Sequence, residues 1–149
     1  MEETPLKPGI HQKLRAYTLT EILIAIALVA ILTAVAIPSY RDYIVRASRS
    51  EATDALLNAA RCQERLYAKF NAFNANLCGG ATPNGLYTVT ITTSNSNQNF
   101  VATATPAGGQ SADACGNLTL SDTGVKTAHG NTGDYAQNCW VGKTVTGSS

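Results

Sequence analysis

The sequence predicts an α+β fold, with one long helix in the N-terminal half and a small antiparallel sheet packed on the C-terminal half of that helix. Two patterns predict the helix: residues 22–37 are apolar and uncharged, and apolar residues then recur at three- and four-residue steps. A third pattern predicts the sheet, because short alternating segments separated by turn residues come after the helix. At 149 residues, the chain has room for about one domain.

The composition limits the classes of partner. The formal net charge is +1, so no overall excess of charge points to nucleic acid or to an anionic membrane. Charged residues make up 14% of the chain, against a usual value of about 25%. The deficit lies in the apolar run and in a C-terminal half rich in Thr, Ser, Asn and Gly. We therefore do not expect DNA to be a partner.

The N-terminal 16 residues differ in character from the apolar run. Residues 1–16 are polar and contain Pro5, Pro8 and Gly9, so they are typical of a leader peptide and not of a folded element. Residues Tyr17–Ile37 then number 21 and carry one charge, that of Glu21. About 20 apolar residues are needed for a helix to cross a bilayer, so this segment is predicted to span a membrane.

The helical pattern continues well beyond the apolar run. The sequence has no glycine between Gly9 and Gly79, and Pro38 is predicted to kink the helix without ending it. The residues that recur at helical spacing are Val45, Ser48, Ala52, Ala55, Ala59, Cys62, Leu66 and Phe70. A helix over Thr18–Phe70 would be ~80 Å long. We expect residues 17–44 to form its membrane and assembly half, and residues 45–149 to form a globular head.

The sheet is predicted from three or four short segments. Residues Cys78–Gly85 have the composition of a loop, and the segments Leu86–Thr93 and Phe100–Thr105 then alternate as the two strands of a hairpin. Residues Leu118–Leu120 make a third strand, and Val125–Thr127 are the candidate for a fourth. So few strands need a partner for their apolar face, and the amphipathic helix supplies one.

All four cysteines lie C-terminal to the apolar run. An even number of cysteines on one side of a membrane span suits two disulfides in an oxidising compartment. A zinc site would need closer spacing or nearby histidines, and the chain has only His11 and His129. Four cysteines allow three connectivities, of which we favour Cys62–Cys78 and Cys115–Cys139 because each pairs sequence neighbours. Each disulfide would contribute on the order of 3 kcal/mol.

The sequence contains no constellation typical of an enzyme. His129 lies in a Gly-rich segment, where it is expected to be a solvated surface residue. We therefore predict no catalytic, cofactor-binding or metal-binding residues and no cofactor. The triplet Asn117-Leu-Thr119 fits a glycosylation sequon, which we attribute to chance.

The N-terminal region carries the most specific motif. Arg15-Ala-Tyr-Thr-Leu-Thr-Glu21 precedes the apolar run, and Pro38-Ser-Tyr-Arg-Asp-Tyr43 comes after it. This arrangement resembles the signature of the type IV pilin family, and the resemblance covers the whole chain. Within the family, the segments Thr103–Gly109, Cys115–Gly124 and Cys139-Trp140 are most similar to PilE-type minor pilins. The resemblance implies the type IV pilin fold.

The resemblance also implies how the chain is processed. Prepilin peptidase would cut between Ala16 and Tyr17, and the new N-terminus at Tyr17 would be N-methylated. The family usually has Gly before the cut and Phe after it, and the position before Glu21 is Thr20 where the family has an apolar residue. Glu21 would then meet the Tyr17 amine of a neighbouring subunit. At ~4 Å and an effective dielectric near 20, that pair is worth about 4 kcal/mol before desolvation.

The implied function is that of a structural subunit, a minor pilin with assembly residues Glu21 and Pro38. Its partners would be other pilin subunits, prepilin peptidase, the assembly platform of the inner membrane and the lipid bilayer. Before assembly the chain would be a single-pass inner-membrane protein with its head in the periplasm, and afterwards part of the extracellular pilus. Such pili serve adhesion, twitching motility and DNA uptake. The alternatives are a major pilin, a type II secretion pseudopilin and a DNA-receptor pilin.

Two other interpretations of the apolar run stay open. Ala34-Val-Ala36 fits a signal-peptidase site, and cleavage there would leave a soluble head. The run could also be a plain one-pass anchor. Charge does not fix its orientation, because Lys7, Lys13 and Arg15 flank one end while Arg41, Arg46 and Arg49 flank the other.

Overall fold

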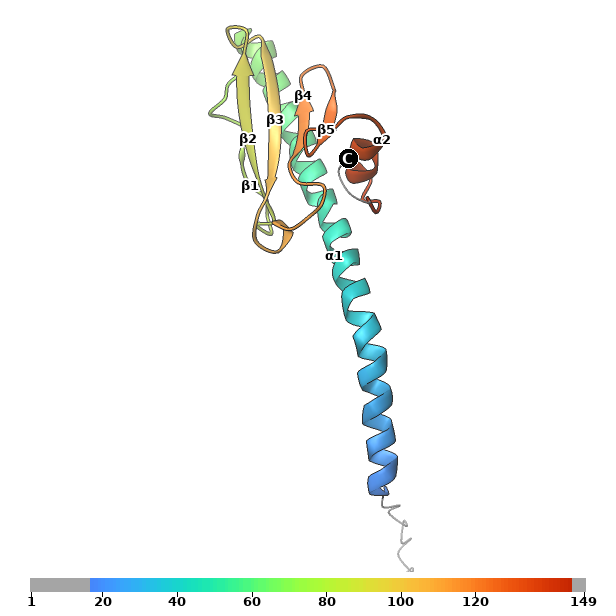
Figure 1. The fold of residues 1–149 in the computed structure, drawn as a ribbon. Helices are drawn as coiled ribbons and strands as arrows, with labels where there is room; N and C mark the ends of the chain where they lie inside the picture. The colour runs from blue at the N-terminus through green and yellow to red at the C-terminus, as the bar shows by residue number, and fades with distance from the viewer. Residues whose placement is uncertain (1–16, 146–149) are drawn as a thin grey trace, which may run out of the picture. The chain divides into compact units, whose positions relative to one another are not determined.

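The structure, a computed structural model, describes residues 17–145, so the predicted leader peptide and Ala16 lie outside the described residues. Figure 1 shows one long helix and a small sheet. The elements are α1 (Leu19–Phe70), β1 (Gly80–Ala81), β2 (Tyr87–Ser94), β3 (Asn99–Pro106), the 3-10 helix η1 (Gly108–Gln110), β4 (Leu118–Ser121), β5 (Lys126–Ala128) and α2 (Gly133–Trp140).

The chain divides into two compact units, Met1–Pro38 and Ser39–Ser149. The described part of the first unit is the apolar half of α1, which is long and apolar enough to cross a membrane and has none of its apolar window buried. Helix α1 continues through Pro38, as predicted. The kink at Pro38 stays a prediction. The predicted boundary between the membrane half and the globular head, at residue 45, also stays a prediction, and it lies six residues beyond the start of the second unit.

The second unit, which we call the head, contains a five-stranded antiparallel sheet in the order β1-β2-β3-β4-β5. The β2–β3 hairpin pairs from Tyr87 with Pro106 to Ser94 with Asn99. At its tip, Asn95, Ser96 and Asn97 all have positive φ angles of 49°, 52° and 63°. Asparagine is among the few residues that tolerate this left-handed conformation, which closes the hairpin after the alternating segments end.

The core of the head lies between the sheet and the C-terminal half of α1. On α1, Leu56 is fully buried together with Ala52, and alternate residues of the strands, including Tyr87, Phe100 and Leu118, are buried opposite them. Burial alternates with exposure along β2, because successive strand residues point to opposite faces of a sheet. The small alanines on both surfaces let the helix lie close to the sheet.

Three elements of the head were not predicted from the sequence. Strand β1 adds a fifth strand to the predicted three or four, and it lies within the segment that was predicted to be a loop. Strand β1 has two residues and therefore no alternation to detect. The preceding residue must be a glycine, because a Cβ on Gly79 would lie only 2.7 Å from the Val89 carbonyl oxygen. Helix α2 and η1 were also missed, because eight and three residues are too few for a helical period to show.

Candidate functional site

The first residues with a predicted functional role lie at the start of α1. Thr18 caps the helix, since its Oγ1 accepts a hydrogen bond of 3.2 Å from the backbone N–H of Glu21. Glu21 lies in the first turn, where a carboxylate is stabilised by the helix dipole. Tyr17 is 75% exposed, and every described side chain from Tyr17 to Ile37 is exposed. This half of the helix thus presents an apolar surface with one carboxylate near its end.

At the other end of α1, a disulfide and a buried glutamine hold the loop that comes after the helix. Cys62 is bonded to Cys78, one of the two pairs favoured from the sequence. One residue further along α1, the buried Gln63 donates to the carbonyl oxygens of Asn74 at 2.7 Å and Leu77 at 2.9 Å, and accepts from the Asn74 N–H. No sequence pattern indicates this role for Gln63, because the sequence does not show which loop groups a glutamine on the buried face of the helix will contact.

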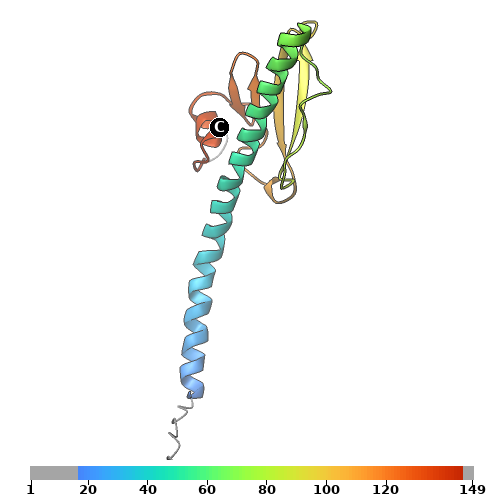
Figure 2. The same cartoon turned by 180° about the vertical axis from the view of Figure 1, so that it is seen from behind.

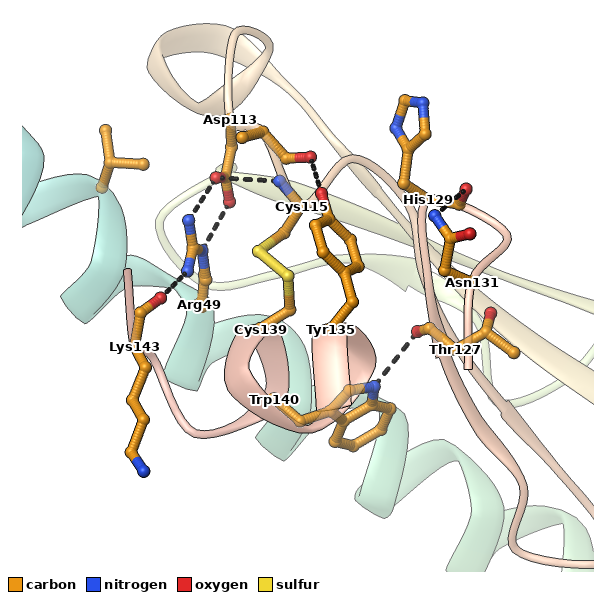
Figure 3. The surroundings of a disulfide bond; sticks show 12 residues. Arg49, Asp113, Cys115, Thr127, His129, Asn131, Tyr135, Cys139, Trp140 and Lys143 are labelled. Carbon is orange, nitrogen blue, oxygen red and sulfur yellow. Dashed lines mark hydrogen bonds and ion pairs between the residues drawn. A yellow bond between two sulfur atoms is a disulfide. The ribbon is translucent and has the colours of Figure 1, made fainter. Parts of the chain in front are cut away.

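The second disulfide, between Cys115 and Cys139, joins the segment after η1 to α2 (Figure 3). Two aromatic residues of α2 hold the same region: the Tyr135 hydroxyl donates to the Ala114 carbonyl oxygen at 2.6 Å, and Trp140 Nε1 donates to the Thr127 carbonyl oxygen at 3.1 Å. The Lys126 Nζ atom lies 4.8 Å from the centroid of the Trp140 ring. The short helix is therefore fixed to both β5 and the preceding loop.

A buried ion pair joins this C-terminal region to α1, as Figure 3 shows. Arg49 donates to both carboxylate oxygens of Asp113, at 2.8 and 2.6 Å, and to the carbonyl oxygen of Lys143 at 2.7 Å. The stripe of residues at helical spacing that was predicted for this helix does not include Arg49, yet Arg49 is only 4% exposed. The sequence pattern did not predict its burial, because Asp113, 64 residues away, supplies the charge that makes that burial tolerable.

Two further groups have perturbed pKa values in the head. Burial raises the pKa of Tyr87, whose hydroxyl accepts a hydrogen bond of 2.9 Å from Gln110. The Thr82 hydroxyl and two hydrogen bonds from Asn84, at 3.1 and 2.7 Å, lower the pKa of Glu51. The charged groups near Tyr87 are Asp113 and Arg49, which pair with each other, and we assign both Tyr87 and Glu51 a structural role.

Apart from Arg41 near the start of the head, the exposed Lys and Arg side chains lie in two places. Arg61, Arg65 and Lys69 are spaced four residues apart on one face of α1. Lys126 and Lys143 lie near α2 instead. Within residues 17–145, no group of three or more His, Cys, Asp and Glu side chains is arranged to hold a metal ion.

Comparison with known proteins agrees with this geometry. Residues 38–119, more than half of the chain, match the family described as "Type IV minor pilin ComP, DNA uptake sequence receptor", and residues 12–37 match the prokaryotic N-terminal methylation motif. The fold resembles that of a type IV pilin from Shewanella oneidensis, with a TM-score of 0.50 and 26% identity over 60% of this chain and 98% of that one.

Individual relatives are fimbrial proteins and type IV pilins. The chain is 34% identical over 99 residues to the fimbrial protein EcpC of Eikenella corrodens, an alignment that covers 64% of this chain and 65% of EcpC. It is 55% identical over 38 residues to the type IV major pilin protein PilE of Neisseria gonorrhoeae, covering 26% and 23% of the two chains. The chain thus spans less than two thirds of the length of these curated relatives.

The long apolar helix, the small sheet packed on its second half and the matched motif agree with one another, and the predicted family is confirmed. The group that matches is that of the ComP minor pilins, so the DNA-receptor pilin that was held as an alternative comes into consideration again. The chain belongs to the type IV pilin family, in the group of ComP-type minor pilins.

Proposed function

We propose that this chain is a subunit of a type IV pilus, cut by prepilin peptidase between Ala16 and Tyr17 and N-methylated at Tyr17. Before assembly, Tyr17–Ile37 hold it in the inner membrane with its head in the periplasm. The assembly platform then inserts it into the pilus, where it contributes to adhesion, twitching motility or DNA uptake. It remains a structural protein throughout, with other pilins and the lipid bilayer as its partners.

One observation carries this proposal. The apolar window of α1 is unburied, while the second half of the same helix forms the core of the head. Burying apolar surface contributes about 25 cal/mol per Å², so a helix half that leaves all of it exposed needs a lipid or protein environment. A bilayer supplies that environment before assembly, and the corresponding helices of neighbouring subunits supply it in the filament.

Glu21 distinguishes a filament subunit from a plain membrane anchor. In an anchor, Glu21→Val removes a costly charge and changes nothing else. In a filament, the same change leaves the Tyr17 amine of a neighbouring subunit without its partner in an apolar setting, which costs several kcal/mol. Glu21→Val should therefore be cleaved and remain in the inner membrane, yet be depleted from sheared filaments.

The test is quantitative blotting of membrane and pilus fractions for the wild type, Glu21→Val and Glu21→Asp. The aspartate variant keeps the charge and shortens its reach by one methylene, so its incorporation should be intermediate. Equal incorporation of Glu21→Val and the wild type would contradict the pairing of Glu21 with Tyr17. Absence of the wild-type chain from filaments would contradict the proposed function itself.

A second candidate function, reception of DNA, is favoured by the match of residues 38–119 to a family described as a DNA uptake sequence receptor. The charge of the head argues for modest affinity, since residues 45–149 carry seven Lys and Arg against six Asp and Glu. The expectation from composition that DNA is not a partner stays a prediction. The family match supports the opposite hypothesis, a DNA-receptor pilin.

The far end of α1 is the surface best suited to DNA. Arg61, Arg65 and Lys69 are exposed there and could contact phosphates. The Phe73 N–H donates to the Asn97 carbonyl oxygen at 2.9 Å, and Gln98 Nε2 donates to the Asn71 carbonyl oxygen at 3.0 Å. These bonds place the amide-rich tip of the β2–β3 hairpin beside Asn71–Phe73, just after the end of the helix that carries the cations, and amide side chains are suited to reading base edges.

Binding of residues 45–149 to a duplex with an uptake sequence, and to a scrambled duplex, tests this function across a salt series. Charge alone predicts a non-specific Kd on the order of 10⁻⁴ to 10⁻⁶ M. A receptor would give submicromolar, salt-sensitive binding that prefers the uptake sequence. Replacing Arg61, Arg65 and Lys69 by Gln should then reduce the salt dependence, whereas Lys126→Gln with Lys143→Gln should not. Equal, weak binding of both duplexes would reject the receptor function.

A further inference from the structure

The sequence contains one Asn-Gly pair, Asn84-Gly85, which lies in the loop between β1 and β2. Figure 2 shows the chain turning back after α1 and running along the edge of the sheet, where β1 pairs with β2. The pair ends a tight turn, because the Gly85 N–H donates to the Thr82 carbonyl oxygen at 2.9 Å. Proline in the second position and glycine in the fourth, as here, are typical of such a turn.

The backbone nitrogen of Gly85 is a potential nucleophile toward the Asn84 side chain. Both residues are exposed, and a Cβ placed on Gly85 would meet no atom of the described chain within 4 Å. Gly85 has a φ of 68°, and a glycine changes backbone conformation at little cost because it has no Cβ. Asparagine loses its side-chain nitrogen most readily before glycine, since no side chain then shields the attacking backbone nitrogen. Asn84 is therefore the asparagine of this chain that the sequence most favours for deamidation.

The carboxylate of Glu51 restrains the same amide. Its Oε2 atom accepts a hydrogen bond of 2.7 Å from Asn84 Nδ2, and its Oε1 atom accepts one of 3.1 Å from the backbone N–H of Asn84. Hydrogen bonds to an ionised acceptor are stronger than neutral ones. Donation from Nδ2 to a carboxylate also strengthens the amide C–N bond and makes its carbonyl carbon a poorer target for a nucleophile. The attacking N–H of Gly85 is engaged as well, by Thr82, so the fold opposes the reaction that the sequence favours.

We propose that Asn84 is a site of slow deamidation whose rate is held down by Glu51. In the reaction, the Gly85 nitrogen gives up its proton to water and bonds to the side-chain carbonyl carbon of Asn84, while the side-chain nitrogen takes up a proton and leaves as ammonia. Water then opens the cyclic imide at one of its two carbonyl carbons, which gives aspartate or isoaspartate at position 84. The net change consumes one water and turns a neutral amide into a carboxylate.

Deamidation turns the contact between Glu51 and position 84 from attraction into repulsion. A carboxylate oxygen then replaces the Nδ2 donor that faces Glu51, and two like charges at hydrogen-bond distance repel each other. The base of the loop is held separately: the Thr82 N–H donates to the Tyr87 carbonyl oxygen at 2.9 Å, and Thr82 Oγ1 accepts from the Tyr87 N–H at 3.1 Å. Release from α1 should therefore be confined to the turn between Thr82 and Tyr87.

This modification goes beyond the proposed function and does not depend on it, since every contact involved lies within the head. The reaction is irreversible, so an older chain carries the change more often than a newly made one. Residues 45–149 would go from seven Lys and Arg against six Asp and Glu to seven against seven. Isoelectric focusing therefore separates deamidated chains from unmodified ones.

Timed incubation of the purified full chain tests the reaction. The chain is kept at neutral pH in water labelled with a heavy oxygen isotope, and peptide mapping follows the label at Asn84. The label enters when water opens the imide, so it excludes any deamidation that took place before the incubation. Labelled aspartate and isoaspartate should both accumulate at position 84, and Asn84→Gln should abolish them because the longer side chain does not form the same ring.

Two variants of Glu51 test the restraint. Glu51→Ala frees the Asn84 amide and should raise its rate of labelling by about three- to tenfold, the effect of one lost hydrogen bond. Glu51→Gln keeps an acceptor without the charge, so its rate should be intermediate. Asp54→Ala is the matched control, since it removes a carboxylate three residues further along α1 and leaves both bonds to Asn84 in place. The exposed Asn95 should be labelled at the same rate in all of these proteins, which shows that no variant has simply unfolded.

Hydrogen exchange of Asn84→Asp tests the effect of the product. Exchange should become faster at Asn84–Leu86 and stay unchanged where β3 pairs with β4; an unchanged rate at Asn84–Leu86 would overturn the release of the turn. Equal labelling of Asn84 in the wild type and Glu51→Ala would overturn the restraint by Glu51. Absence of label at Asn84 in every protein, over a time in which Asn95 reacts, would overturn the site itself. None of these measurements involves a filament, so their failure is distinct from failure of the proposed function.

Discussion

Arg49 lies on the face of α1 that packs on the head, where it donates to Asp113 and to the carbonyl oxygen of Lys143. A guanidinium has five N–H donors in a planar fork, so it can satisfy both carboxylate oxygens and a backbone carbonyl at once. Desolvation of the two charges offsets much of their attraction. The pair therefore fixes where the C-terminal segment lies on α1 more than it adds net stability.

Removing one partner of this pair should be far more destabilising than removing both. Arg49→Ala leaves the Asp113 carboxylate buried and unpaired, which costs about 3–5 kcal/mol. The double variant Arg49→Met with Asp113→Leu should lie within about 1–2 kcal/mol of the wild type. Urea denaturation of residues 45–149 measures both. Similar losses for the single and double variants would contradict this account.

Glu51 makes the free energy of unfolding of the head decrease at acid pH. Its pKa in the folded head lies below the ordinary value of 4.5, owing to Thr82 and Asn84. A lowered folded pKa adds stability that is present above 4.5 and is lost as the pH falls through the folded value. Glu51→Gln should reduce this acid loss, whereas Asp54→Asn should leave it unchanged. Denaturation midpoints between pH 3 and pH 6 test this, and parallel curves for the wild type and Glu51→Gln would refute it.

Among the elements, α2 is the one whose position depends most on a covalent bond. It has eight residues and begins at Gly133, so it would not be stable as an isolated helix. The Cys115–Cys139 disulfide fixes it to the segment that carries Asp113, and the hydrogen bond of Tyr135 to Ala114 supports the same contact. Loss of the disulfide should therefore loosen α2 before it affects the sheet.

Replacing Cys115 and Cys139 by Ser should lower the free energy of unfolding by roughly 2–5 kcal/mol. Hydrogen exchange should become faster in α2 and β5. It should change little in the β2–β3 hairpin, because the backbone hydrogen bonds between β2 and β3 hold those two strands together. Peptide mapping without reduction provides the control, since it should find Cys62 linked to Cys78 in both proteins. Equal acceleration throughout the sheet would contradict a local role for this disulfide.

The elements that the sequence predicted are those with a long or regular pattern. Helix α1 starts one residue later than predicted and ends where predicted, and β2 is shifted by one residue. Strand β1 and helix α2 escaped prediction because they are held by contacts made elsewhere: the pairing of β1 with β2, and the disulfide to α2. Arg49 and Gln63 show the same limit at the level of side chains, since their partners are 64 and 11–14 residues away.

At the scale of the whole molecule, the two halves of the chain require different surroundings. The apolar half of α1 needs lipid or other helices, whereas the head has its own buried core and two disulfides. The site of cleavage decides whether these halves stay together. Cleavage between Ala16 and Tyr17 keeps them joined, while cleavage after Ala36 would release the head.

Mass spectrometry of the mature protein should find an N-terminus at Tyr17 carrying one added methyl group. Methylation keeps the positive charge of the amine, so pairing with Glu21 stays possible. Ala16→Gly restores the residue usual before the cut and should be processed at least as fast, whereas Ala16→Leu should slow cleavage. An N-terminus at Ile37 would instead support the secretory interpretation of the apolar run.

Two of the contacts that join α1 to the rest of the head differ in kind and lie far apart, and this has a mechanical consequence. Arg49 with Asp113 lies near the start of the head, and the Cys62–Cys78 disulfide lies 13 residues further along α1, about 20 Å away. A pulling force applied along the helix is resisted near the start of the head by an ion pair, which can break and re-form. At the far end it is resisted by a disulfide, which is covalent. Under load, we therefore expect the contacts around Arg49 to yield before the far end of the helix, which the disulfide holds.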